Sequence, residues 1–293
     1  MNKTNILYKF VDLPNGETIA YQEREGGEKN VLLIHGNMTS AKHWDLVLEN
    51  MDPHYKLFAV DMRGFGDSSY HEKINSIQDF SDDMKAFVDT IALKNFSIIG
   101  WSTGGAVGMQ LVADYPGICE KLILLASAST RGYPFYDLEG NRLSSYEEVR
   151  SDYGKTIPIQ HAYDTKDHEF LKQLWNTLIY TKNQPSKERY DEYIADMLTQ
   201  KNLAEVYQAL NTFNISNKHN GLISGNALVK NIKLPVLVLR GDRDLVVTKQ
   251  MAEEIIEDIG SAAQFIELKD CGHSPLIDDL EGLLKQFSDF LGG

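Results

Sequence analysis

The sequence predicts an α/β fold: a mostly parallel β-sheet with helices on both faces and a helical segment inserted between two strands. Two observations predict it. Short apolar runs of strand length alternate with longer amphipathic runs over residues 1–130, and the alternation resumes at Leu234 after a long stretch without a buried-strand pattern. Because strands that alternate with helices usually pair in parallel and need cover on both faces, one open sheet is expected.

The elements can be assigned in order from the N-terminus. Residues 6–13 and 18–25 have the pattern of two hairpin strands, since Pro14-Asn15-Gly16 between them is a turn sequence. Strands and helices then alternate. The predicted strands are 31–34, 56–60, 96–99 and 122–126, and the predicted helices are 41–51, 77–93 and 106–115.

The pattern changes after Ser129. From about Arg131 to Val229 the chain is polar, rich in tyrosine and helical in its spacing, and two further strands follow at 234–240 and 263–268. This organisation predicts a core made of residues 1–130 and 229–293, with residues 131–228 as a helical insertion. Because loops at the carboxyl ends of parallel strands usually carry function, the insertion is expected to contribute to a site.

Composition narrows the class of protein. A formal net charge of −13 disfavours binding to nucleic acid or to anionic membranes, because both need clustered Lys and Arg. No apolar run reaches the ~20 residues of a membrane span, and Met1–Phe10 lacks the apolar stretch of a signal peptide, so a cytoplasmic protein is expected. With only 2 cysteines and no metal-ligand spacing, neither a disulfide scaffold, a metal nor an organic cofactor is expected.

The strongest motif is Gly100-Trp101-Ser102-Thr103-Gly104, which lies between a predicted strand and a predicted helix. A serine on such a tight turn projects its hydroxyl, and the flanking glycines remove side chains that would collide there. The first N–H groups of the helix lack intrahelical partners and can stabilise negative charge. The motif therefore predicts that Ser102 is a nucleophile.

A nucleophilic serine needs a base, and the base needs an orienting acid. His273 follows the last predicted strand, while Asp242 and Asp244 both follow strand 234–240. Periodicity does not decide between the two carboxylates. Cys271 lies on the same loop as His273, away from any strand-to-helix turn, and is interpreted as a buried thiol. Most other histidines are assigned to surface or cap positions: His43, His54, His71, His161, His168 and His219.

These motifs, in the chain order serine, acid, histidine, identify the sequence as similar to the α/β-hydrolase family over nearly its whole length. His35-Gly36-Asn37 resembles the family's oxyanion loop, and the segment 61–68 resembles its D-x-R-G-x-G-x-S turn. The resemblance implies that the N–H groups of Asn37 and Thr103 face an oxyanion, and that His35 is structural. It favours Asp244 over Asp242, because the family pattern G-x-x-D begins at Gly241.

The resemblance also implies that residues 131–228 form a cap over the serine and shape substrate choice. Tyr133, Phe135 and Tyr136 come directly after a strand end and are predicted, with Trp101, to bind substrate; Trp101 is equally compatible with packing against the cap. An apolar or mixed acyl pocket is expected. The chain resembles capped carboxylesterases, intracellular poly(3-hydroxybutyrate) depolymerases of bacilli and acyl homoserine lactonases.

The predicted function is hydrolysis of a small carboxylic ester, a lactone or a short polyester through an acyl-enzyme. The same three residues would also serve a carbon–carbon bond hydrolase or a cofactor-free perhydrolase. A non-catalytic binding protein of this fold would usually lack part of the triad. The sequence gives no indication of the oligomeric state.

Overall fold

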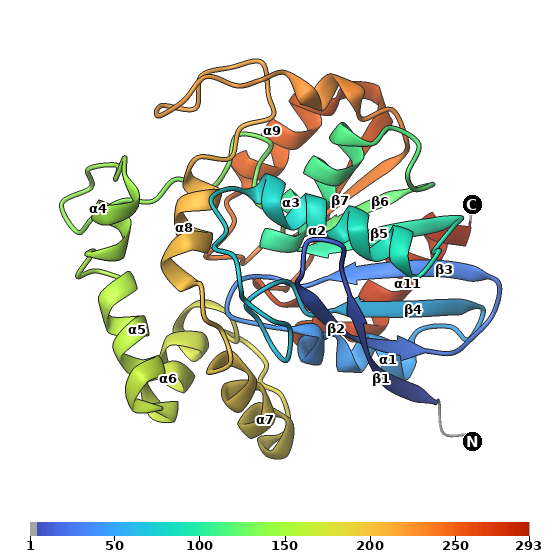
Figure 1. The fold of residues 1–293 in the computed structure, drawn as a ribbon, viewed down its shortest axis with the longest axis horizontal. Coiled ribbons are helices and arrows are strands. Elements are labelled where there is room, and N and C mark those ends of the chain that lie inside the picture. Colours follow the sequence, from blue (N-terminus) through green and yellow to red (C-terminus); the bar gives the residue numbers. More distant parts are fainter. Residues whose placement is uncertain (1–4, 293) are drawn as a thin grey trace.

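The computed structural model describes residues 5–292. Eight strands within this range form one sheet in the order β1-β2-β4-β3-β5-β6-β7-β8 (Figure 1). β2 pairs antiparallel with β1 and β4, and all other pairs are parallel, which confirms the predicted sheet. The strands are β1 Ile6–Asp12, β2 Thr18–Arg24, β3 Lys29–Ile34, β4 Tyr55–Val60, β5 Phe96–Trp101, β6 Leu122–Leu125, β7 Val236–Gly241 and β8 Ala263–Leu268.

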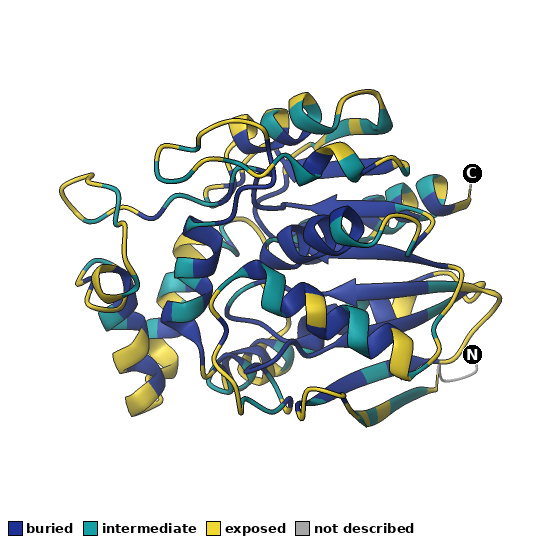
Figure 2. Ribbon diagram, turned by 45° about the horizontal axis from the view of Figure 1, so that its top comes forward, coloured by how far each residue is buried: buried dark blue, intermediate teal, exposed yellow. Residues whose placement is uncertain are grey.

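The central strands are largely apolar and buried because helices cover both faces of the sheet (Figure 2). In β3, Leu32 and Ile34 belong to one hydrophobic core, and Val31 and Leu33 belong to the other. The first core includes helices α2 (Ile77–Thr90), α3 (Thr103–Asp114) and α9 (Lys249–Ile259), and the second includes α1 (Asp45–Asn50) and α11 (Leu280–Gly292).

The observed turns and helices agree closely with those predicted from the sequence. The hairpin turns where expected, with Gly16 at a φ of 88° and the Leu13 N–H donating to the Glu17 carbonyl at 2.7 Å. The predicted helix 41–51 forms as a 3₁₀ turn, η1 (Ala41–Trp44), that leads into α1. Further short elements are η2 Leu228–Asn231, η3 Gly260–Ala262 and α10 Pro275–Asp278.

Five α-helices lie between β6 and β7 in the chain. They gather at the end of the sheet where the parallel strands finish (Figure 1). The helices are α4 Tyr146–Arg150, α5 Thr156–Thr165, α6 His168–Leu178, α7 Lys187–Met197 and α8 Leu203–Asn211. Together with their connecting loops they are called the helical segment below.

Helix α7 is attached to the η1–α1 region of the core by polar contacts. The Tyr193 hydroxyl donates to the Asp45 carboxylate at 2.5 Å, and the Ser40 hydroxyl donates to the Asp196 carboxylate at 2.6 Å. His43 lies under this helix, with its ring 4.2 Å from that of Tyr193. The assignment of His43 to the surface or the cap is therefore wrong: it is a core residue, buried because Tyr193 stacks on it.

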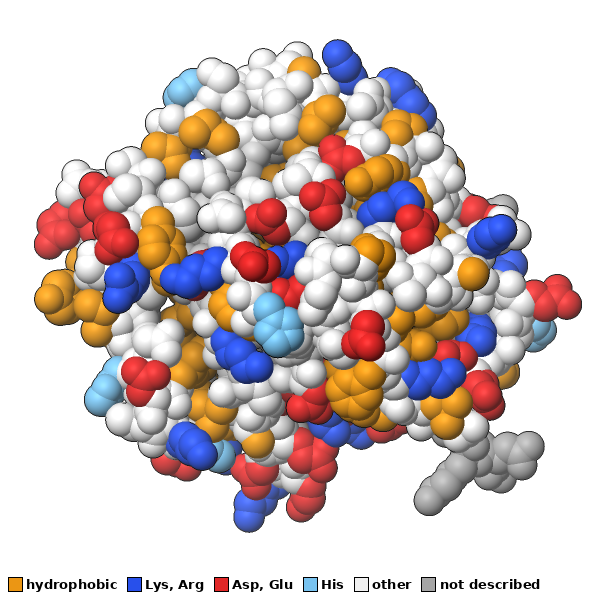
Figure 3. Space-filling model, viewed as in Figure 1, with side chains coloured by type: hydrophobic (Ala, Val, Ile, Leu, Met, Phe, Trp, Pro, Cys, Tyr) orange, Lys and Arg blue, Asp and Glu red, His pale blue; other side chains and the backbone are white. Residues whose placement is uncertain are grey.

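The surface carries a mixture of charges. On the face shown in Figure 3, acidic and basic side chains are interspersed. Within residues 5–292, every helix is too short or too polar to cross a membrane.

Candidate active site

Ser102 occupies the turn between β5 and α3 with φ 54° and ψ −114°, a conformation that non-glycine residues rarely adopt. The glycines around it are explained by close backbone approaches. A Cβ on Gly100 would collide with the carbonyl oxygen of Gly104, and one on Gly104 would collide with that of Ile34. A Cβ on Gly36 would lie 3.1 Å from that of Ser102. The sequence thus folds into a tight turn that presents the serine hydroxyl.

Asp244 and His273 form a buried pair beside this turn. Nδ1 of His273 lies 2.9 Å and 3.2 Å from the two carboxylate oxygens of Asp244. The nearer oxygen is Oδ2. The other oxygen, Oδ1, accepts the N–H groups of Val246 and Val247 at 2.8 Å and 2.9 Å. Asp242, on the same turn, is exposed. Of the two candidate carboxylates, the one beside the histidine is that of Asp244.

Trp101 touches both the nucleophile's turn and the histidine's loop. Its indole N–H donates to the backbone carbonyl of His273 at 2.9 Å, and the two ring centroids are 5.9 Å apart. It is almost fully buried, yet it also lines the cavity described below. Its clearest physical effect is to fix the position of the His273 backbone.

Asn37 and Thr103, whose N–H groups are the predicted oxyanion donors, line the same cavity as Ser102. Thr103 is the first residue of α3, and Asn37 follows β3. Within residues 5–292, neither N–H donates a hydrogen bond to another protein group, as expected for a free helix start and an open loop. Asn37 is positioned by Gln200 of the helical segment, whose amide donates to Asn37 Oδ1 at 2.8 Å.

His35 holds the Asn37 loop in place and is not aimed at the serine. Its Nε2 accepts the Met62 N–H at 2.9 Å, and Nδ1 lies 2.7 Å from the Gly36 carbonyl oxygen. Burial lowers the pKa of His35 to about 4, so the ring is neutral at pH 7. The neutral form with a proton on Nδ1 satisfies both contacts.

The segment 61–68 has a supporting role of the same kind. The Asp61 carboxylate accepts the N–H groups of Ala41 and Asp67 at 2.8 Å and 3.0 Å, and burial raises its pKa to about 7. Arg63 makes two hydrogen bonds to the Asp83 carboxylate, at 2.7 Å and 2.6 Å. The contact of Asp61 with Ala41 joins the segments after β3 and β4, and the contacts of Arg63 with Asp83 join the loop after β4 to helix α2.

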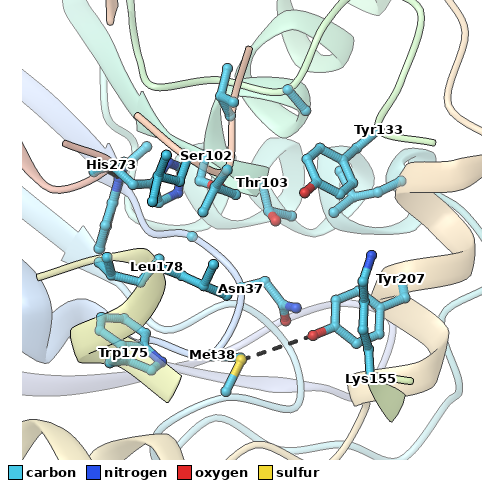
Figure 4. Close-up of a pocket in the computed structure, with 18 of the residues that line it drawn as sticks. Asn37, Met38, Ser102, Thr103, Tyr133, Lys155, Trp175, Leu178, Tyr207 and His273 are labelled. Carbon is cyan, nitrogen blue, oxygen red and sulfur yellow. Dashed lines mark hydrogen bonds between the residues drawn. The ribbon is translucent and has the colours of Figure 1, made fainter. Parts of the chain in front are cut away.

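A cavity of about 370 Å³ lies between the core and the helical segment (Figure 4). Ser102, Thr103, Asn37 and His273 line it, together with Trp101. The remaining lining residues are mostly apolar: Gly36, Met38, Ala128, Tyr133, Phe135, Lys155, Ile159, Leu174, Trp175, Leu178, Ile179, Tyr207, Leu210, Leu245, Val246 and Val247.

Of the three aromatic residues predicted to bind substrate, two line the cavity and one does not. Tyr133 and Phe135 line it, whereas Tyr136 is 43% exposed and lies outside the lining. The backbone of Tyr136 pairs instead with that of Arg142 in a short antiparallel bridge, and the residue is exposed to solvent. The assignment of Tyr136 to the substrate site is therefore wrong.

Eight lining residues of the helical segment are not among the site residues predicted from the sequence: Lys155, Ile159, Leu174, Trp175, Leu178, Ile179, Tyr207 and Leu210. The sequence indicates only that the insertion is rich in tyrosine, without distinguishing Tyr207 from the other tyrosines. The one available signal was their location in the insertion. Burial raises the pKa of Tyr207 well above its usual range, so its hydroxyl stays protonated.

Both cysteines are free and buried. Burial raises the pKa of Cys271 to about 11 and that of Cys119 to about 12, so both are thiols at neutral pH. Among residues 5–292, no three His, Cys, Asp or Glu side chains cluster in a way that could hold a metal ion.

Known proteins resemble this chain in sequence and in fold. A family model described as alpha/beta hydrolase fold matches residues 29–280. A 2-hydroxy-6-oxononadienedioate/2-hydroxy-6-oxononatrienedioate hydrolase of Paraburkholderia phymatum is 24% identical over 97% of this chain and 95% of its own. Lipase 1 of Psychrobacter immobilis is 24% identical over 99% of this chain and 85% of its own. An esterase structure from Exiguobacterium antarcticum superposes with a TM-score of 0.76 at 16% identity, covering 98% and 100% of the two chains.

Proposed function

Because the chain belongs to the α/β-hydrolase family, we propose that it is a serine hydrolase that cleaves a carboxylic ester through an acyl-enzyme intermediate. The observation that carries the proposal is the shared cavity. Ser102 on its strained turn, His273 and the residues Asn37 and Thr103 all line this one space, and Asp244 contacts His273 from behind it.

In the proposed mechanism, His273 removes the proton of Ser102 as the hydroxyl attacks the ester carbonyl carbon. Asp244 holds the imidazole with its proton on Nδ1 and stabilises the imidazolium that forms. His273 then protonates the leaving alcohol, and the same histidine activates the water that releases the acid. Ser102 and His273 make no hydrogen bond in the structure; such bonds often tighten only when substrate is bound.

The N–H groups of Asn37 and Thr103 would bind the oxyanion of the tetrahedral intermediate. A donor of this kind typically contributes on the order of 10²–10³ in rate, because it is oriented before charge develops. Both donors are backbone groups, so this role does not depend on the side chains of Asn37 and Thr103.

The dienedioate hydrolase of P. phymatum favours a second candidate. Its name describes a 6-oxo acid, and hydrolysis at a ketone carbonyl breaks a carbon–carbon bond. The same nucleophile and base would serve that reaction, because the first step is again addition to a carbonyl group. The carbanion leaving group would then need a proton from His273.

A substrate panel tests the proposal. Purified protein and its Ser102→Ala variant would be assayed with p-nitrophenyl esters, an acyl homoserine lactone, hydroxybutyrate oligomers and a vinylogous 1,5-diketone. We expect ester hydrolysis that falls by on the order of 10⁶ in kcat when Ser102 is replaced. Cleavage of the diketone without cleavage of any ester would favour the second candidate, and an unchanged Ser102→Ala variant would exclude both.

A further inference from the structure

The cavity extends to two different sides of Ser102 (Figure 4). One side, here called the apolar arm, is lined by the helix α6 residues Leu174, Trp175 and Leu178 and by Ile179. The other, here called the polar arm, is lined by Tyr133, Phe135, Lys155 and Tyr207. Figure 4 shows His273 and Leu178 on one side of the serine, with Tyr133, Tyr207 and Lys155 on the other.

The apolar arm is the one next to the histidine. A Cβ on Gly272 would lie 3.4 Å from the carbonyl oxygen of Ile179, so the end of α6 rests against the histidine's loop. In the proposed mechanism His273 protonates the leaving group, which must therefore depart on that side of the serine. The acyl part of the substrate is left to extend into the polar arm.

The polar arm contains two aromatic rings packed at a tilt of 44°, with the Lys155 ammonium group near one of them. The rings of Phe135 and Tyr207 have centroids 4.8 Å apart, and Lys155 Nζ lies 4.8 Å from the Phe135 centroid. The Tyr207 hydroxyl lies 4.0 Å from the sulfur of Met38, a weak acceptor. Its donor capacity is little used by the protein.

Among residues 5–292, Lys155 is the only Lys or Arg that lines the cavity, in a chain with a formal net charge of −13. Within residues 5–292, no carboxylate lies within 4.0 Å of its Nζ. Asp152, three positions earlier in the chain, does not pair with this ammonium group; its carboxylate accepts the backbone N–H groups of Lys155 and Thr156 at 2.7 Å and 3.4 Å. The ammonium group is therefore free to pair with a ligand.

We propose that the preferred substrate carries an anionic group, a carboxylate, at the far end of its acyl part, and that Lys155 binds it. This inference rests on the proposed function, because the position of the leaving group defines which arm takes the acyl part. The protein would then favour half-esters of dicarboxylic acids, with an apolar alcohol in the apolar arm.

The test compares two matched series of esters with one leaving group. The anionic series consists of mono-p-nitrophenyl esters of glutaric, adipic and suberic acids, and the neutral series of p-nitrophenyl alkanoates of the same lengths. The readout is the ratio of kcat/KM for the anionic ester to kcat/KM for its neutral partner. We expect Lys155→Met to lower this ratio roughly 3- to 10-fold, since methionine keeps the length of the side chain but not its charge.

Two controls sharpen the result. Lys187→Met removes an exposed lysine of the same helical segment that does not line the cavity, and the ratio should not change. Lys155→Arg should keep most of the ratio, and added NaCl should lower it in the wild type but not in Lys155→Met. An unchanged ratio in Lys155→Met would overturn the proposal and leave Lys155 as a packing residue on Phe135.

Measurements of ester binding distinguish a failure of this inference from a failure of the proposed function. Calorimetric titration of the Ser102→Ala protein with each half-ester and its neutral partner reports affinity without turnover. If no ester is hydrolysed but the anionic ester binds in a manner that depends on Lys155, the proposed function fails and the anion site stands. If esters are hydrolysed and neither binding nor the ratio depends on Lys155, the inference about the anion site fails alone.

Discussion

At the scale of single residues, environment distinguishes the two carboxylates that follow β7. Asp242 and Asp244 have the same chemistry and lie two positions apart, but Asp242 is exposed and Asp244 is buried against His273. Buried in this way, the Asp244 carboxylate is held by two backbone N–H groups and can orient the imidazole.

We predict that Asp244→Asn lowers kcat for a good p-nitrophenyl ester by on the order of 10⁴, because the amide favours the wrong tautomer of His273. Asp242→Asn is the matched control on the same turn and should stay within about twofold. Steady-state kinetics of the two variants measures the difference. A large loss in Asp242→Asn with little loss in Asp244→Asn would contradict the assignment.

Some residue assignments could be predicted from the sequence, and others could not. The sequence could place Ser102, Asn37 and His273 after predicted strands, because each belongs to a short motif of consecutive residues. Tyr136 was misplaced because adjacency to a strand end does not define which way a loop side chain points. Lys155 and Tyr207 lie far from any motif, and only the packing of the helical segment brings them beside Phe135.

At the scale of elements, the attachment of α7 to the core depends on a few buried polar contacts. Asp45 accepts the Tyr193 hydroxyl and pairs with Arg189, while Ser40 and His43 meet Asp196. These contacts hold the helical segment over the cavity. A buried carboxylate that loses a donor carries a desolvation penalty, so the contacts are expected to matter for stability.

We predict that Tyr193→Phe lowers the free energy of unfolding by roughly 1–3 kcal/mol, since the Asp45 carboxylate loses a buried donor. Urea denaturation followed by circular dichroism measures it. Tyr153→Phe, at a side chain that is 79% exposed in the same segment, should change stability by less than about 0.5 kcal/mol. Equal effects in the two variants would show that the Asp45 contact contributes nothing.

The elements of the core were predictable because their signal is local. A strand such as β3, apolar on both faces, is distinguished by its length and by its flanking turns. The helical segment was predicted only in outline. Its helices are short and polar, and their arrangement depends on contacts such as Tyr193 with Asp45 that link residues 148 positions apart.

At the scale of the whole molecule, the parallel sheet brings the proposed catalytic groups to one edge. Asn37 follows β3, Ser102 follows β5, Asp244 follows β7 and His273 follows β8. Because the carboxyl ends of parallel strands meet at the same edge, residues far apart in the chain converge there. The helical segment lies over the same space and supplies much of the cavity lining.

The measurement that tests the central claim most directly is active-site labelling with a fluorophosphonate. The reagent reacts with a serine activated by a nearby base and mimics the tetrahedral intermediate. Peptide mass spectrometry should find one adduct per chain, located on Ser102, and none after Ser102→Ala or after denaturation before labelling. An intact, folded protein that forms no adduct, or forms it on a different serine, would contradict the account.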